Sequence, residues 1–378
     1  MAANHTRWGE RPRDPVFAHG HHGSPGVSPR QSEILLPVRS YDLAATLDSG
    51  QVFRWQKEND SWVGVVGKNF ARLTQADGGI LAETSAGIDD LDWLREFLQT
   101  GTNLDEVLKT FPDDEPMRAA VASCHGLRVL RQDPWECLVS FILSSTKQIV
   151  QIRQIVALLC ERFGAPVFSP SSQKGGEGRG EEAKYFRVQF PSPQPSPRLA
   201  ERGGRKDGRA VYGDRAVSSP SPRPSKRAGA RGNFISNENP LLLSFPTAER
   251  LALATEAELR DCKMGFRAPS LLAAAREIAE GKFDLERIRQ LPHAEARAEL
   301  MKLRGVGGKI ADCVLLFAYG FDSAFPVDVW IERALQQLYF PRRRASEPRL
   351  RRFAATHFGP HAGYAQQYLF HYMRTKLK

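Results

Sequence analysis

Hydrophobic and polar positions alternate through much of residues 33–83, a pattern typical of half-buried strands. Two runs rich in apolar residues, 62–66 and 70–73, flank a short turn at 67–69 that contains glycine and asparagine. Strands joined by so short a turn run in opposite directions. The pattern therefore predicts an antiparallel sheet near the N-terminus.

Helical periodicity follows the predicted strands. Leu91, Leu94 and Leu98 fall on one helical face. Residues 138–163 predict a buried helix, a short break and a second helix with an apolar stripe. Helical patterns then continue from Thr247 to the C-terminus, interrupted by glycines and prolines. Together these patterns predict an α+β fold, in which a small antiparallel β-rich N-terminal domain precedes a mainly α-helical body.

Two segments carry no hydrophobic period. Residues 1–32 are rich in Gly, Pro, His and Arg, and we expect a disordered tail there. Residues 169–232 contain eight prolines and many Ser, Gly and Arg residues, which predicts a disordered low-complexity insertion. The rest divides into an N-terminal β domain with helices at 33–125 and a helical domain made of 126–168 and 233–378.

The formal net charge of +10 favours a polyanionic partner, but the charge is unevenly placed. The insertion holds fourteen basic and six acidic residues, the tail has a net charge of +2, and the remaining chain is neutral overall. Affinity of the folded part for a nucleic acid must therefore come from local patches and backbone amides. Two interpretations of the insertion stay open: it adds non-specific DNA affinity, or it is a dispensable spacer.

The five cysteines are scattered and form no Cys-x-x-Cys or Cys/His cluster, so we expect buried reduced thiols, no metal site and no cofactor. The sequence shows no secretory signal and no apolar run long enough to span a membrane. We therefore expect an intracellular monomer without a membrane partner. Its place would be the cytoplasm or nucleoid of a bacterium, or the nucleus of a eukaryotic cell.

Residues 303–309 read Leu-Arg-Gly-Val-Gly-Gly-Lys and separate two apolar helical patterns. This arrangement predicts a helix, a tight hairpin and a second helix. Gly305 and Gly307 would leave backbone N–H groups open to a phosphate at a helix N-terminus, while Val306 would fill the core between the helices. An ordinary turn between two core helices is the alternative interpretation.

Lys309 would lie in the first turn of the second helix, where the helix dipole disfavours a positive charge. A neutral amine held beside a DNA backbone can act as a nucleophile. Asp328 follows Phe-Pro-Val and precedes a new apolar helical pattern, which predicts that it caps that helix. A capping carboxylate near an amine could orient it, accept its proton and stabilise a developing cation. We therefore predict that Lys309 and Asp328 are the catalytic pair.

These residues resemble the helix–hairpin–helix DNA glycosylase superfamily with the Gly/Pro-Asp signature, and within it the 8-oxoguanine DNA glycosylases of the eukaryotic type. The likeness covers 33–168 and 233–378. It rests on five segments in the same order: Ser-Gly-Gln-Val-Phe-Arg-Trp at 49–55, Arg-Gln-Asp-Pro-Trp-Glu-Cys-Leu at 131–138, Gly-Phe-Arg-Ala at 265–268, the hairpin at 305–313, and Gly-Pro-His-Ala-Gly-Tyr-Ala-Gln at 359–366.

The resemblance implies a helical catalytic domain that binds damaged double-stranded DNA during base excision repair. An enzyme that acts at C1′ must flip the nucleotide out of the duplex, because the stacked helix hides that carbon. Lys309 would displace 8-oxoguanine and form a Schiff base with the opened sugar. Nicking of the strand by β-elimination would follow, so the activity would combine a glycosylase with an apurinic-site lyase.

The resemblance also implies roles in lesion binding. The backbone carbonyl of Gly50 would accept the N7 hydrogen that 8-oxoguanine has and guanine lacks, and Gln366 would read the Watson–Crick edge. Phe370 and Cys313 would sandwich the base. Without the resemblance, Phe370 and Cys313 fit core positions equally well, and Gly50 fits a turn between strands.

On the opposite strand, Phe266 would wedge into the vacated stack and Arg267 would contact the orphaned cytosine. Three positions depart from the family pattern. Thr146 stands in a run where the family is rich in asparagine, and Gln151 stands where it has arginine, so we predict a relaxed preference for the opposite base. Trp330 replaces the usual histidine, which bears on phosphate contacts rather than on the chemistry.

Two other functions remain open. An endonuclease III-like glycosylase for oxidised pyrimidines shares the hairpin, the lysine and the aspartate, but it normally carries a C-terminal four-cysteine iron–sulfur cluster. This chain has no cysteine after Cys313. A non-catalytic helix–hairpin–helix module would bind DNA without altering it.

Overall fold

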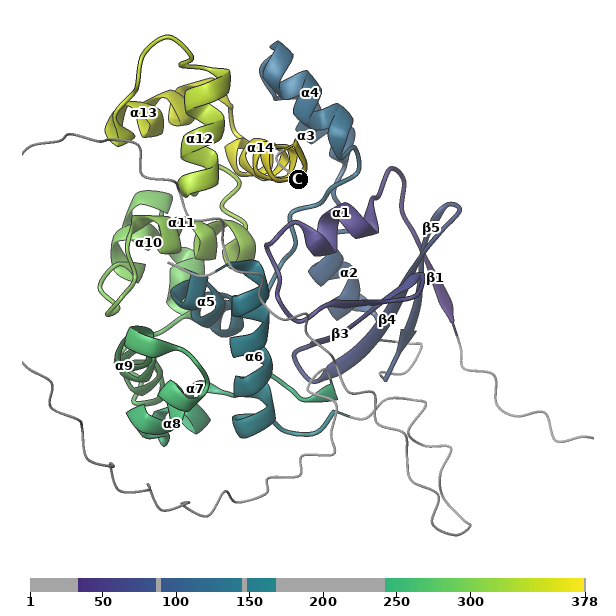
Figure 1. The fold of residues 1–378 in the computed structure, drawn as a ribbon. Coiled ribbons are helices and arrows are strands. Elements are labelled where there is room, and N and C mark those ends of the chain that lie inside the picture. Colours follow the sequence, from purple (N-terminus) through teal and green to yellow (C-terminus); the bar gives the residue numbers. More distant parts are fainter. Residues whose placement is uncertain (1–32, 86–89, 145–147, 168–241, 377–378) are drawn as a thin grey trace, which may run out of the picture. The chain divides into compact units, whose positions relative to one another are not determined.

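The computed structural model describes residues 33–85, 90–144, 148–167 and 242–376. The predicted tail, the predicted insertion and Thr146 lie outside these residues. The described part contains an N-terminal antiparallel sheet and a helical body (Figure 1), so the predicted α+β fold is confirmed.

Five strands form the sheet, in the spatial order β1-β5-β4-β3-β2 with every pair antiparallel. Their bounds are β1 Ile34–Pro37, β2 Gln56–Glu58, β3 Ser61–Val66, β4 Asn69–Ala76 and β5 Gly79–Thr84. The predicted turn at 67–69 is one residue too long, because Asn69 already pairs with Val66 in the ladder. Gly67 takes a positive φ of 58°, which allows this two-residue connection.

Two short helices cover the sheet core: α1 (Leu43–Asp48) and α2 (Asp92–Leu98). The predicted apolar face of α2 is confirmed, since Leu91, Leu94 and Leu98 are all buried. Trp55 stacks on Phe97 with ring centroids 5.7 Å apart. This packing fixes the chain that leads from α1 into β2, which later forms one wall of the site.

The other N-terminal helices, α3 (Leu104–Lys109) and α4 (Glu115–Ser123), contribute to the core of the helical body rather than to the sheet core. Helix α4 packs against the C-terminal helix α14 (Ala362–Lys376). The last helix of the chain is therefore held between the N-terminal region and the body.

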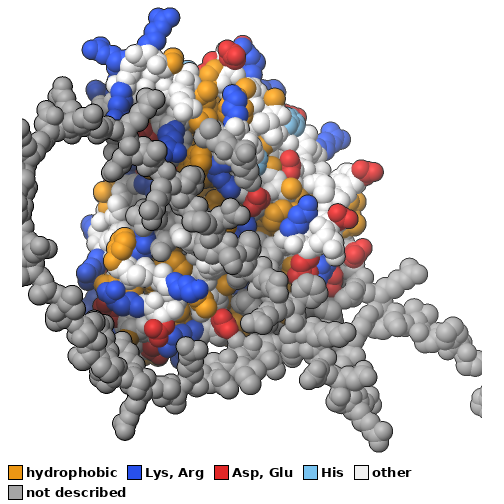
Figure 2. All heavy atoms as spheres, in the orientation of Figure 1, with side chains coloured by type: hydrophobic (Ala, Val, Ile, Leu, Met, Phe, Trp, Pro, Cys, Tyr) orange, Lys and Arg blue, Asp and Glu red, His pale blue; other side chains and the backbone are white. Residues whose placement is uncertain are grey.

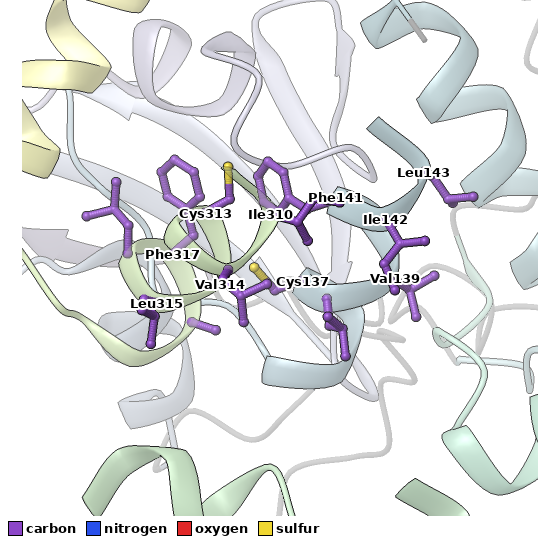
Figure 3. Close-up of a cluster of buried hydrophobic side chains, with 14 of the residues drawn as sticks. Cys137, Val139, Phe141, Ile142, Leu143, Ile310, Cys313, Val314, Leu315 and Phe317 are labelled. Carbon is purple, nitrogen blue, oxygen red and sulfur yellow. The ribbon is translucent and has the colours of Figure 1, made fainter. Parts of the chain in front are cut away.

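The remaining helices, apart from η4, contribute residues to this core. Their bounds are α5 Pro134–Leu143, α6 Ile149–Phe163, α7 Ala248–Ala252, α8 Glu256–Asp261, η4 Gly265–Arg267, α9 Ala268–Ala279, η5 Glu286–Gln290, α10 His293–Leu300, α11 Gly308–Val314, the π-helix η6 Leu315–Tyr319, α12 Val329–Leu338 and α13 Glu347–His357. Helices α5 and α6 confirm the two helices predicted over 138–163, with α5 beginning earlier, at Pro134. Figure 3 shows Cys137 and Phe141 of α5 facing Ile310 and Val314 of α11 across the core.

The chain leaves and re-enters the body at one place on either side of residues 168–241. The Val167 N–H donates to the Leu242 carbonyl at 2.6 Å, and the Ser244 N–H donates to the Ala165 carbonyl at 2.8 Å. These bonds form a short antiparallel stem. The two segments that flank residues 168–241 are therefore paired with each other.

Within the described residues, no helix combines the length and the apolar character that a membrane crossing requires.

Candidate active site

The hairpin between α10 and α11 has the predicted form. Val306 is buried in the core between the two helices, while Gly305 and Gly307 are exposed. Gly305 has a positive φ of 86°, and a Cβ there would lie 2.7 Å from the Ser270 side chain of α9. No atom would lie within 4 Å of a Cβ on Gly307. Glycine is therefore needed for the fold at Gly305, and Gly307 leaves open space in which a phosphate could approach the start of α11.

A cavity of about 1080 Å³ opens beside this hairpin. Its walls come from the loop after α1, from the ends of α5 and α6, from α11 and α12, and from α14. Among the predicted site residues, those that line the cavity are Gly50, Gly305, Gly307, Lys309, Cys313, Asp328, Gln366 and Phe370. Segments far apart in the sequence thus meet around one hollow, as the predicted roles require.

Lys309 reaches into the cavity from the first turn of α11. Its Nζ atom donates a hydrogen bond to the Ser144 hydroxyl at 2.8 Å. The same nitrogen lies 5.5 Å from the centroid of the Phe141 ring. The amine therefore has a defined resting position at the end of α5.

Asp328 is the N-cap of α12, as predicted. One carboxylate oxygen accepts hydrogen bonds from the Trp330 N–H at 3.0 Å and the Ile331 N–H at 2.9 Å. Burial raises the pKa of this carboxyl above its usual range, and the two amide bonds and the charge of Lys309 partly oppose that effect. The helix thus holds a partly desolvated carboxylate rigidly at the cavity wall.

Lys309 and Asp328 share the cavity, but among the described contacts no ion pair joins them. They interact electrostatically, since the lysine lowers the pKa of Asp328. Cys313 lies one helical turn after Lys309, and burial raises the pKa of its thiol to about 12. At neutral pH the cysteine is therefore a neutral, polarisable wall rather than a competing nucleophile.

Gly50 is held by a network around its neighbours. The buried Gln51 side chain donates to three oxygen atoms, including the Arg128 carbonyl at 2.8 Å, and accepts from the Leu130 N–H at 2.8 Å. Side-chain amides also donate to the Ser49 and Gln51 carbonyls. Gly50 itself has a φ of 85°. The network fixes an unusual backbone conformation that only glycine adopts easily and that borders the cavity.

Gly50, Phe370 and Gln366 form one corner of the cavity. A Cβ on Gly50 would lie 3.3 Å from the Phe370 ring and 2.8 Å from Ile149. Gln366 is buried and lines the cavity, and its Oε1 atom has no hydrogen-bond partner among the described residues. An unpartnered buried acceptor is costly unless a ligand supplies the donor. This corner can therefore receive a flat group with polar edges.

Phe266 and Arg267 lie in η4, and neither lines the cavity. The Phe266 side chain is 68% exposed, whereas Arg267 is buried with its guanidinium carbon 4.4 Å from the Phe266 ring centroid. An exposed aromatic ring beside a glycine suits the predicted wedge. The predicted contact of Arg267 with a cytosine stays a prediction.

Gln151 caps a helix, a role that the sequence did not indicate. Its side-chain oxygen accepts a hydrogen bond from the Gln148 N–H at 3.1 Å and so caps the start of α6. Gln151 does not line the cavity. Its predicted place near the opposite base, like that of Thr146, stays a prediction.

Other residues also line the cavity without having been predicted as site residues, among them Ser144, Phe141, Arg374 and Glu332. Arg374 donates to the Asp48 carbonyl at 3.1 Å and lies over the Phe370 ring, 5.5 Å from its centroid. Trp330, noted earlier only as a departure from the family, also lines the cavity. Within the described residues, His, Cys, Asp and Glu form no group of three that could hold a metal ion.

Comparison with known proteins agrees with this geometry. Residues 33–138 match the family model of the 8-oxoguanine DNA glycosylase N-terminal domain, and residues 227–358 match that of the HhH-GPD superfamily of base excision DNA repair proteins. The chain belongs to the 8-oxoguanine glycosylase type of the HhH-GPD superfamily.

Individual relatives extend over most of the chain. A probable N-glycosylase/DNA lyase of Methanothermobacter thermautotrophicus is 28% identical over 348 residues, which are 90% of this chain and 95% of the relative. The N-glycosylase/DNA lyase of Saccharomyces cerevisiae is 27% identical, over 79% of this chain and 68% of the relative.

Solved structures show the same fold. The structure of MBOgg1 with a low affinity DNA ligand has a TM-score of 0.71 and 25% identity, covering 93% of this chain and 98% of that one. The Clostridium acetobutylicum 8-oxoguanine glycosylase/lyase bound to duplex DNA, with cytosine opposite 8-oxoguanine, has a TM-score of 0.68 and 24% identity over 92% of this chain and 100% of that one. The second likeness supports the fold alone.

Proposed function

We propose that this protein is a bifunctional DNA glycosylase and apurinic-site lyase that removes 8-oxoguanine from duplex DNA in base excision repair. The observation that carries this proposal is the convergence of Lys309, Asp328 and the Gly50–Gln366 corner on one cavity beside an open helix–hairpin–helix. A nucleophile, a carboxylate and a base-sized recess at a phosphate-binding hairpin are the parts that base excision at C1′ needs.

The first chemical step joins Lys309 to the sugar. Lys309 reacts as the neutral amine: its Nζ lone pair forms a bond with C1′ while the C1′–N9 bond breaks, and the bonding electrons leave with the base. Asp328 stabilises the positive charge that develops on the sugar, because a partly desolvated carboxylate interacts strongly at short range. The amine then loses a proton, and opening of the sugar ring gives a Schiff base.

The second step breaks the strand. The Schiff base acidifies the C2′ hydrogen, and its removal expels the 3′ phosphate by β-elimination. Hydrolysis of the remaining imine would free Lys309 for another turnover. The hydrogen bond between Lys309 and Ser144 belongs to the enzyme without DNA.

Lesion recognition follows from the polar groups at the corner of the cavity. The Gly50 carbonyl would accept the N7–H of 8-oxoguanine, a donor that guanine lacks at that position. Gln366, whose Oε1 is unpartnered among the described residues, would accept from the Watson–Crick edge. Phe370 and Cys313 would cover the two faces of the base.

Binding to the DNA backbone would combine hairpin amides with a local basic patch. Arg342, Arg343 and Arg344 are exposed in the loop between α12 and α13, where Figure 2 shows basic side chains gathered. The Gln336 side chain orders this loop, donating to the Arg343 carbonyl at 3.0 Å and accepting from the Ala345 N–H at 2.8 Å. An ordered cationic loop suits sequence-independent phosphate contacts. We expect the protein to act as a monomer.

The enzyme would discriminate weakly among the bases opposite 8-oxoguanine. The groups predicted to face the opposite base are Phe266, Arg267, Thr146 and Gln151. Two of them have polar side chains that the structure describes. Gln151 caps a helix, and Arg267 packs on Phe266. We therefore propose that the enzyme excises 8-oxoguanine with little regard to its partner base.

The direct test incubates excess purified protein with a duplex that contains one 8-oxoguanine and resolves the strands with and without alkali. We expect release of the base and a nick that forms without alkali. Nicking only after alkali would leave a glycosylase without lyase activity. A parallel duplex with one oxidised pyrimidine separates the endonuclease III-like alternative, and binding without any release would indicate a non-catalytic module.

A further inference from the structure

Ser144 occupies a special place at the end of α5. Its hydroxyl donates a hydrogen bond to the Phe141 carbonyl at 2.8 Å, the same carbonyl that accepts from the Ser144 backbone N–H at the helix end. The same oxygen accepts a hydrogen bond from Lys309 Nζ at 2.8 Å. A hydroxyl has a single proton, so Ser144 can offer only its lone pairs to the amine.

The aromatic ring beneath the amine is fixed as well. The Lys309 nitrogen lies 5.5 Å from the Phe141 ring centroid, within the range of a cation–π contact. Phe141 in turn stacks on Phe317 at 5.4 Å and meets Phe53 edge-on at 5.9 Å. The hydroxyl and the ring therefore form a rigid seat for a side chain that is otherwise among the most flexible in proteins.

We propose that Ser144 is a positioning residue for Lys309: its hydroxyl holds the amine at the cavity wall before DNA arrives. This inference rests on the proposed function, because positioning matters only if Lys309 attacks the sugar. An amine with one resting place loses less conformational freedom on reaching C1′ than an amine that samples many rotamers. The contact should therefore influence the rate of chemistry and leave the affinity for DNA unchanged.

The experiment compares Ser144→Thr with Ser144→Val, because these side chains have nearly the same shape and differ in the oxygen that accepts from the amine. Single-turnover release of 8-oxoguanine at saturating protein gives the rate, and a binding titration gives the dissociation constant separately. Ser140→Ala is the matched control, since Ser140 lies one turn earlier on the same helix and does not line the cavity. A thermal melt of each variant reports folding.

We expect the valine variant to react about 10- to 100-fold more slowly than the threonine variant, with the threonine variant near wild type and all dissociation constants within about threefold. Equal rates for the threonine and valine variants would overturn the proposal, as would a faster valine variant, which would mean that the contact restrains the amine. An equal loss in Ser140→Ala would also overturn it. Absence of base release by the wild-type protein would instead refute the proposed function.

Discussion

The residues assigned to the lesion are held in place by hydrogen bonds to the fold, whereas the residues assigned to the opposite strand are exposed or engaged elsewhere. Gly50 is fixed by the buried amide network of Gln51, and Asp328 is fixed by two backbone N–H groups. Among the residues assigned to the opposite strand, Phe266 projects into solvent and the side-chain oxygen of Gln151 caps the start of α6. Preorganised polar groups discriminate strongly, and exposed or diverted ones do not. The comparison predicts strict recognition of the lesion and loose recognition of its partner.

Asp328 offers the largest test on the lesion side, because capping and chemistry can be separated there. Asparagine caps helices as well as aspartate does but carries no charge, so Asp328→Asn should lower single-turnover excision about 10³-fold without a loss of stability. Asp328→Ala should lose the same activity and in addition about 1 kcal/mol of unfolding free energy. Rates and denaturant melts of the two variants check this. Wild-type rates in Asp328→Asn would leave the carboxylate with a structural role only.

Gly50 tests whether the corner of the cavity is as tightly defined as its network indicates. In Gly50→Ala, a Cβ 2.8 Å from Ile149 and 3.3 Å from Phe370 should narrow the base recess and reduce excision about 10²-fold. Gly78→Ala is the matched control, because Gly78 also has a positive φ of 79° but no atom within 4 Å of an added Cβ. Both variants should lose similar stability, and only the first should lose activity. Equal activity in the two would contradict the assigned recess.

The opposite strand gives the smaller expected effect. Excision of 8-oxoguanine paired in turn with each of the four bases should differ by less than about 10-fold, because a well-made bidentate base contact supplies about 5- to 150-fold discrimination and the Gln151 and Arg267 side chains are engaged in other contacts. Arg267→Ala should reduce any remaining preference for cytosine while leaving Phe266 in place. A preference for cytosine greater than about 100-fold would show that this side is built as strictly as the lesion side.

The smallest effect is expected from removing residues 168–241. Joining Val167 to Leu242 by a short Gly-Ser linker removes 168–241 but keeps the stem that the flanking residues form. Because the ends already meet and a short loop costs less entropy to close than a long one, the thermal midpoint of unfolding should rise by about 5 °C. Calorimetry of the shortened and full chains measures this. A drop in the midpoint would mean that the removed residues stabilise the fold.

Much of the fold and part of the site follow from short-range patterns. The hairpin at Gly305, the cap at Asp328 and the paired helices α5 and α6 each depend on residues close together in the chain, so periodicity and turn chemistry predict them. The predicted turn between β3 and β4 was one residue too long, because the register depends on the partner strand.

The parts of the site that patterns could not supply depend on contacts between distant segments. Ser144 meets Lys309 across 165 positions, and no local signal distinguishes it from any serine at a helix end. The closeness of Gly50 to Phe370 came only from the family resemblance, because an isolated glycine also fits a turn. The diversion of Gln151 to a helix cap depends on the exact start of α6, which sequence periodicity leaves uncertain by a residue or two.

The central claim is that the Lys309 amine bonds to the sugar of a flipped lesion nucleotide. Sodium borohydride reduces a Schiff base and would lock the protein to DNA, so the measurement is covalent trapping on an 8-oxoguanine duplex by wild type and by Lys309→Gln at matched DNA occupancy. We predict a trapped complex for the wild type and none for the variant, although the variant still binds the duplex. Trapping that persists in Lys309→Gln, or its absence in a wild type that releases the base, would contradict the account.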